Sequence, residues 1–206
     1  MSGRIFAGFL AVLLMMVAGA AEPTRVVQAE EILKKIELGQ SVEYDNVTVV
    51  GDLNLTRLDL PKVPLQRFWL ETSLGLPDYE ILILSSINIT NSVIEGSINL
   101  DGAAFQNVAL FNGTRFEGPV SIIGSRFIQV ASFLGARFNQ ASYIRARFNQ
   151  AVSFRMAQFN ETAYFSGSKF DNTAEFWGAK FNHNAYFWGT RFSYASFEDT
   201  NVSSNI

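Results

Sequence analysis

The residue types that most often perform chemistry are scarce in this chain of 206 residues. It contains no cysteine and a single histidine, His183, so disulfides, thiol chemistry and the commonest metal and catalytic arrangements lack their residues. Serine and aspartate are plentiful, but no candidate base is placed to activate them, and no phosphate-binding loop or paired carboxylates stand out. We predict no catalytic residue, no metal site and no cofactor, and we expect His183 to be a solvated surface residue.

Six Asn-x-Ser/Thr sequons are the other residues to which a chemistry can be assigned, because exported proteins carry N-linked glycans at such sites. The sequons begin at Asn46, Asn54, Asn88, Asn112, Asn160 and Asn201. A chain rich in Asn, Ser and Thr also produces these tripeptides by chance, so both interpretations stand. We expect at least one to be glycosylated only if the source organism modifies its exported proteins.

The N-terminus has the pattern of a signal peptide over residues 1–21. Arg4 supplies the positive charge, residues 5–17 are apolar except for Gly8, and residues 18–20 (AGA) form a small-x-small cleavage site. The apolar stretch is short for a bilayer-spanning helix, which needs about 20 residues. We therefore predict export, with an uncleaved membrane anchor and peripheral membrane association as the alternative.

The composition is that of a folded protein with no strong charge. Hydrophobic residues make up 48% and charged residues 17%, and the formal net charge is −3. Residues 1–100 contain 7 basic and 12 acidic side chains, and residues 101–206 contain 9 and 7. Neither half is charged enough to predict a polyanionic partner, and we expect no nucleic acid to bind.

Large apolar residues recur with a period of eleven, because the steps between them alternate between six and five residues. The series runs from Ile83 to Phe197, with two consecutive steps of five around Tyr143 and a final step of five. We predict that its phenylalanines form the core: Phe105, Phe111, Phe116, Phe127, Phe133, Phe138, Phe148, Phe154, Phe159, Phe165, Phe170, Phe176, Phe181, Phe187, Phe192 and Phe197.

A small or β-branched residue lies two positions before nearly every large one, as Ala136 lies before Phe138, and glycines such as Gly135 and Gly178 recur at fixed offsets. Residues two apart face different ways in a helix, where each glycine would also cost about 1 kcal/mol. In a β-strand, residues two apart point to the same face, and recurring glycine is typical of turns. The pattern predicts very short strands joined by corners, which is an all-β solenoid over residues 83–197.

These units resemble the pentapeptide repeat family, in its phenylalanine-centred variety with an extra residue in alternate repeats. Residues 135–139 (GARFN) and 178–182 (GAKFN) look like its A-x-F units. The resemblance covers 83–197, with a weaker match at 47–60, and the steps of five around Tyr143 depart from the alternation. It implies a right-handed quadrilateral parallel β-helix whose coils lie about 4.8 Å apart, with the large residue and the small one before it pointing inward.

The segment before the repeats, residues 22–45, fits a protected solenoid end. Residues 28–38 place Ile32, Leu33 and Ile36 on one face and are followed by a glycine, which predicts a short amphipathic helix. A solenoid end otherwise exposes apolar core and open strand edges. We expect this helix to cap the first coil.

The first coil is predicted over residues 46–82, interrupted by an insertion at 61–80 in which three prolines break the period. We expect the insertion to pack against the barrel wall. The C-terminal tail, residues 198–206, predicts no helix and offers little protection. Three arrangements stand for the last coil: it is exposed, it pairs with a second copy in a homodimer, or it continues in a longer protein.

The residues directly before the phenylalanines form two basic rows if one coil holds about 22 residues. One row is Arg115, Arg137, Gln158 and Lys180, and the opposite row is Arg126, Arg147, Lys169 and Arg191. Like charges about 4–5 Å apart repel by about 1 kcal/mol in water, so acids or anions should lie nearby, and Glu117, Glu161 and Asp171 occupy adjacent corners. The rows either bind an acidic polymer or lipid head groups, or form a solvated surface that these acids compensate.

Four aromatic residues near the C-terminal end of the repeats form a candidate interaction surface: Tyr164, Trp177, Tyr186 and Trp188. The two tyrosines are one coil apart, and Trp177 occupies the matching corner of the neighbouring face. Exposed aromatic rings bind glycans and protein partners. The other interpretation is a ladder of rings across coils that steadies the wall.

The sequence predicts an exported, non-enzymatic repeat scaffold that binds a protein or a surface glycan at the cell envelope. One alternative is the exported repeat domain of a larger membrane protein. Another follows from the resemblance, because members of the family mimic DNA and inhibit topoisomerases. That activity would need a cytosolic location and an acidic face.

Overall fold

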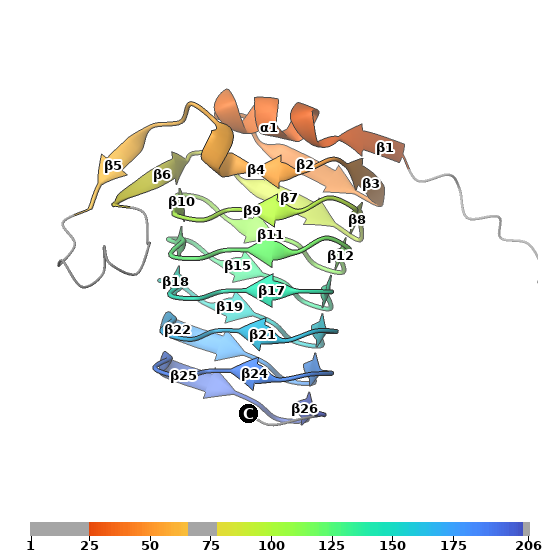
Figure 1. The fold of residues 1–206 in the computed structure, drawn as a ribbon, viewed down its shortest axis with the longest axis vertical. Coiled ribbons are helices and arrows are strands. Elements are labelled where there is room, and N and C mark those ends of the chain that lie inside the picture. The colour runs from red at the N-terminus through yellow and green to blue at the C-terminus, as the bar shows by residue number, and fades with distance from the viewer. Residues whose placement is uncertain (1–24, 66–77, 204–206) are drawn as a thin grey trace, which may run out of the picture.

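A computed structural model describes residues 25–65 and 78–203, which form a stack of parallel β-coils (Figure 1). In each regular coil the chain makes four short strands, one on each of four faces, before it enters the next coil. We number the faces 1 to 4 in the order in which the chain passes through them. The predicted quadrilateral parallel β-solenoid is therefore confirmed.

Each face is a ladder of strands that pair in parallel with the coils before and after. Face 1 is an eight-stranded sheet of β1 (Arg25–Gln28), β3 (Val47–Val50), β8 (Val93–Ile94), β12 (Arg115–Phe116), β16 (Arg137–Phe138), β20 (Gln158–Phe159), β23 (Lys180–Phe181) and β26 (Asn201–Val202). Face 2 is a six-stranded sheet of β4 (Leu53–Asn54), β9 (Ile98–Asn99), β13 (Val120–Ser121), β17 (Ala141–Ser142), β21 (Ala163–Tyr164) and β24 (Ala185–Tyr186).

Faces 3 and 4 are joined into one twelve-stranded sheet, because β22 (Lys169–Glu175) and β25 (Arg191–Ser196) run across the corner between them. Face 3 also contains β6 (Tyr79–Ile83), β10 (Ala103–Phe105), β14 (Arg126–Phe127) and β18 (Arg147–Phe148). Face 4 also contains β2 (Val42–Asp45), β7 (Ile87–Thr90), β11 (Ala109–Leu110), β15 (Ala131–Ser132) and β19 (Val152–Ser153).

The pairing register follows the sequence period. Arg137 pairs with Arg115, 22 residues earlier, whereas Gln158 pairs with Arg137, 21 residues earlier. The shorter coil contains the two consecutive steps of five around Tyr143. The departure from the repeat is therefore absorbed within one coil, and the face assignment of every later strand is preserved.

Aromatic rings fill the interior by stacking from coil to coil. Along face 3 the ring centroids of Phe105 and Phe127 lie 4.7 Å apart, those of Phe127 and Phe148 4.8 Å apart, and those of Phe148 and Phe170 5.0 Å apart, with nearly parallel planes. Rings of different faces meet edge to face, an arrangement that favours aromatic pairs. These buried rings occupy the interior of the described coils from Phe105 to Phe181.

The predicted phenylalanine core is confirmed from Phe105 to Phe181, all of which are buried. It is wrong at the end of the stack, where Phe187 and Phe192 are only partly buried and Phe197 is 42% exposed. A ring inside the stack is covered by the coil before it and the coil after it. Within the described residues no further coil lies beyond Phe197.

At the corners between faces 2 and 3 and between faces 4 and 1 the backbone is left-handed, and most of these positions are glycine, with φ +65° at Gly135 and +71° at Gly167. Five described residues with side chains adopt the same conformation: Asn46, Asn91 and Asp199, whose residue types tolerate it best, and Arg145 and Met156, with φ +55° and +56°. An L-residue pays about 1–2 kcal/mol in this region. Arg145 and Met156 are therefore the corners at which the repeat departs from its least strained form.

The N-terminal helix α1 (Ala29–Glu37) lies across the first coil and confirms the predicted cap (Figure 1). Its Ala29, Ile32 and Ile36 side chains are buried against the core. The sequence did not predict β1, which pairs in parallel with β3, or β2, which begins before the expected start of the first coil at residue 46. These two strands extend the solenoid toward the N-terminus.

The predicted insertion at residues 61–80 makes the first coil long, so that Val42 pairs with Ile87 and hydrogen bonds join side chains 45 residues apart. After a short 3-10 turn, η1 (Leu55–Arg57), the chain forms β5 (Lys62–Pro64), which is exposed and pairs antiparallel with β6. The expectation that the insertion packs on the wall is wrong for this part, because an open strand edge on face 3 pairs with it instead. Residues 66–77 lie outside the described ranges.

Candidate functional site

The first basic row is confirmed as a straight ladder on face 1. Arg115, Arg137, Gln158 and Lys180 occupy paired positions on successive strands. Arg115 forms an ion pair of 2.9 Å with Glu117, one of the three acids expected to compensate the rows. Among the described residues, Arg137 and Lys180 have no ion-pair partner. Face 1 therefore carries uncompensated positive charge beside a compensated end.

The second basic row lies on the opposite face, face 3. Arg126, Arg147, Lys169 and Arg191 pair in register from coil to coil. The Asp171 carboxylate forms ion pairs with Arg147, at 2.9 Å, and with Lys169, at 2.6 Å. The hydrogen bond from Lys169, and then that from Arg147, lowers the pKa of the Asp171 carboxyl below its usual value. One carboxylate thus compensates the middle of the row.

Arg126 stands apart from the rest of this row. It forms a 2.5 Å ion pair with Glu80, a buried carboxylate at the start of β6. A charge buried without a partner is strongly unfavourable, so Arg126 is required to keep Glu80 inside the fold. Arg126 therefore has a structural role, and the cations open to ligands on face 3 are those of the later coils.

The four predicted aromatic residues do not form one surface. Tyr164 and Tyr186 stack on face 2 with ring centroids 5.4 Å apart, which agrees with a ladder along the wall. Trp188 lies at the corner between faces 2 and 3 and is 85% exposed. Trp177 lies at the diagonally opposite corner, between faces 4 and 1, where the guanidinium of Arg155 sits 5.1 Å from its ring centroid.

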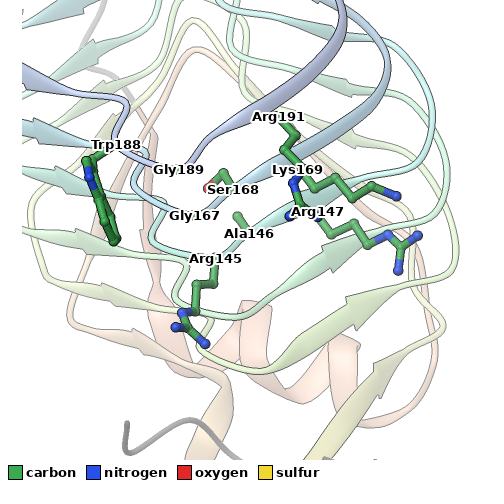
Figure 2. A pocket seen from close by; sticks show the side chains of 9 residues that line it. All are labelled: Arg145, Ala146, Arg147, Gly167, Ser168, Lys169, Trp188, Gly189 and Arg191. Atoms are coloured by element: carbon green, nitrogen blue, oxygen red, sulfur yellow. The ribbon is translucent and has the colours of Figure 1, made fainter. Parts of the chain in front are cut away.

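A hollow of about 380 Å³ brings Trp188 and the face 3 row together (Figure 2). Its lining residues come from three successive coils and are Arg145, Ala146, Arg147, Gly167, Ser168, Lys169, Trp188, Gly189 and Arg191. Figure 2 shows Trp188 on one side of Gly167 and Gly189 and the three cations of the row on the other. Arg145 belongs to the same coil as Arg147. The hollow is thus a positively charged corner with one flat apolar ring.

Sequence reasoning missed Arg145. It is neither before a phenylalanine nor aromatic, so it belonged to neither predicted row. The signal that could have found it is its position two residues after Tyr143, where most other coils have glycine. A charged residue at a strained corner is a reason to look for a function at that place.

The six sequons differ in accessibility. Asn46, Asn160 and Asn201 are exposed. The side-chain oxygen of Asn54 accepts a hydrogen bond from the Thr56 backbone at 3.0 Å, and that of Asn112 accepts one from Ser132 at 2.6 Å. Asn88 is half-buried. The exposed Asn160 side chain also donates to Asn139 at 3.1 Å and accepts from Asn182 at 3.2 Å. Glycosylation remains a prediction, and Asn46 and Asn201 are the sites where a glycan would break no side-chain hydrogen bond among the described residues.

The other sequence predictions concern His183, metal sites and membrane association. His183 is exposed, as expected. In residues 25–65 and 78–203 no group of His, Cys, Asp or Glu gathers in a way that could hold a metal ion, and no helix is long and apolar enough to span a membrane. The predicted signal peptide lies outside the described residues.

The C-terminal end of the stack has an apolar hollow of about 430 Å³ lined by Phe181, Phe187, Phe192, Phe197, Thr200 and Val202. This is the surface that the predicted homodimer would use. Pairing of two copies there stays a prediction.

Comparison with models of protein families assigns the repeats to a known family. A family model described as pentapeptide repeats (9 copies) matches four overlapping segments, residues 100–145, 111–155, 143–191 and 157–201. No curated protein and no solved structure matches the chain. The matched segments coincide with the coils whose phenylalanines stack in the interior and whose corners are left-handed. Its repeats, its four-sided coils and this match identify the chain as a member of the pentapeptide repeat family.

Proposed function

We propose that this protein is an exported, non-enzymatic scaffold that binds proteins or surface polymers at the cell envelope through the outer faces of its solenoid. One observation carries the proposal: outward side chains of one kind are held in register once per coil, as in the rows on faces 1 and 3. Such a surface presents a repeated chemical group along a straight line. It suits a partner that is itself extended.

The packing of the interior supports an external binding mode. Rings from Phe105 to Phe181 are buried and stack from coil to coil, so a ligand of these coils would contact their outer wall and not their interior. Stability in such a stack is close to a sum over neighbouring coils. Outward residues can therefore vary for binding with little effect on the fold.

Export rests on the pattern of residues 1–21, with its basic start, apolar stretch and small-x-small site. An exported repeat domain of a larger membrane protein would bind in the same way and differ in what it is attached to. Mimicry of DNA ranks last, because it needs rows of acids where faces 1 and 3 carry rows of cations.

The experiment that tests export is mass spectrometry of the native protein recovered separately from medium, envelope and cytosol. We expect a chain that begins near residue 21 in the envelope or the medium, with any glycans at the exposed Asn46 or Asn201. An intact N-terminus confined to the cytosol would overturn the proposal and favour the topoisomerase-binding alternative.

A further inference from the structure

The hollow beside Trp188 exists because the wall is bare at two successive corners. Backbone hydrogen bonds align Gly124, Arg145, Gly167 and Gly189 in one column, each corner bonding to the next coil. Arg145 is the only member of this set with a side chain. A Cβ on Gly167 would lie 3.1 Å from Cγ of Arg145, so the glycine gives the arginine room to lie along the wall.

The charge of the hollow is strongly positive. Four cations line it, and Asp171, which pairs with Arg147 and Lys169, is the one carboxylate that engages them among the described residues. Arg145 and Arg191 have no ion-pair partner in those residues. A guanidinium offers paired N–H donors that match a carboxylate or a sulfate.

Trp188 supplies the second recognition element. The residue at its position in the preceding coil is Ser166, because Gly167 and Arg145 bond to the carbonyls of Trp188 and Ser166. The indole therefore projects from a corner whose neighbours are small, and it is 85% exposed. A flat apolar ring beside cations fits the C–H face of a sugar whose substituents are anionic.

We propose that this corner binds an anionic polysaccharide. One sugar ring of the polymer lies against Trp188, and acidic groups of the polymer contact Arg145 and Arg191. This inference rests on the proposed function and names the class of surface polymer. The hollow is shallow and continues into the face 3 row, whose cations repeat at each coil, about 4.8 Å apart. A chain with an acidic group on each sugar would follow that row, whereas a small anion would use only one end of it.

Two other anionic partners fit less well. A membrane surface would need several apolar side chains beside the indole, whereas the other residues that line the hollow are four cations, Gly167, Gly189, Ser168 and Ala146. Single-stranded nucleic acid is bound by several aromatic rings in succession, and Trp188 is alone on its corner column. Both partners are outcomes of the test below.

The test is calorimetric titration of the purified protein with oligogalacturonate, with neutral galactan oligomers of the same length as the control ligand. We expect binding of oligogalacturonate that weakens with salt, and no binding of galactan. Arg145→Gly and Trp188→Ser should each weaken binding at least tenfold. Both replacements restore residues that occupy the same positions in neighbouring coils, so folding should be retained.

Matched controls exist at the opposite corner. Met156→Gly removes an equivalent left-handed side chain and Trp177→Ser an equivalent indole, and neither residue lines the hollow. These variants should bind within about twofold of the unmodified protein. Equal affinity of all four variants would overturn the proposal, as would preferential binding of anionic vesicles or of single-stranded DNA. Because the titration is done in solution, its failure removes the ligand class, whereas failure of export is read from the terminus and fraction of the native protein.

Discussion

Replacing Phe154 by alanine is expected to lower the free energy of unfolding by about 3–5 kcal/mol. Its ring is fully buried and stacks on Phe133 at 5.1 Å and on Phe176 at 5.0 Å, so the substitution leaves a cavity that spans three coils. The rings above and below cannot close this cavity, because backbone hydrogen bonds fix the coil spacing. Denaturant unfolding followed by circular dichroism measures the loss.

The control is Phe197→Ala, which removes the same side chain from a ring that is 42% exposed and stacks on Phe176 alone, at 4.8 Å. We expect it to cost less than half as much as Phe154→Ala. Equal losses at the two positions would show that burial between coils does not stabilise the stack in the way described.

Tyr143→Phe is expected to raise the free energy of unfolding by about 1–2 kcal/mol. The Tyr143 ring is fully buried and stacks on Phe165 at 4.8 Å, but its hydroxyl has no hydrogen-bond partner among the described residues. Phenylalanine keeps the stacking and removes the unsatisfied group. Tyr194→Phe, at a residue that is 62% exposed, should leave stability nearly unchanged.

The same hydroxyl makes stability depend on alkaline pH. Burial raises the pKa of the Tyr143 hydroxyl well above its usual value of about 10. Above pH 10 the unfolded chain releases this proton while the folded chain keeps it, so stability is complete below pH 10 and falls as pH rises, by about 1.4 kcal/mol per unit. The advantage of Tyr143→Phe over the unmodified protein should therefore grow above pH 10. A difference independent of pH would contradict a buried, protonated hydroxyl.

Much of the fold could be predicted because every coil of a solenoid makes the same contacts and therefore has the same sequence pattern. A phenylalanine every five or six residues, with a small residue two positions before it, determines which side chains point inward and which pairs stack. The two basic rows followed directly, since Arg115 and Arg137, or Arg147 and Lys169, differ by one coil. The shorter coil around Tyr143 could also be predicted, because Phe138, Tyr143 and Phe148 are separated by two equal steps of five residues.

What could not be predicted lacks that repetition. β1 carries no phenylalanine step, and its pairing with β3 depends on where α1 directs the chain. The antiparallel pairing of β5 with β6 is a long-range contact that no period encodes. The exposure of Phe197 depends on the absence of a covering coil in the described residues, which a repeat pattern does not report.

The candidate site was only half predicted. Trp188 and the cations of face 3 were found separately, because one criterion selected aromatic residues and the other selected residues before phenylalanine. Their meeting at one corner depends on the bare glycine column, and on Arg145, which both criteria passed over. The assignment of Trp177 to the same surface was wrong for the same reason, since residues eleven apart lie at opposite corners.

The central claim is that the wall of this solenoid faces the outside of the cell. Labelling of intact cells with a membrane-impermeant amine-reactive reagent, followed by peptide mass spectrometry, tests it most directly. Lys180 is exposed and has no ion-pair partner among the described residues, so it reports access to the wall. We predict that Lys180 is labelled in intact cells to the same extent as in the purified protein, while a cytosolic reference protein stays unlabelled. Labelling of Lys180 only after lysis would contradict display of the solenoid at the cell surface.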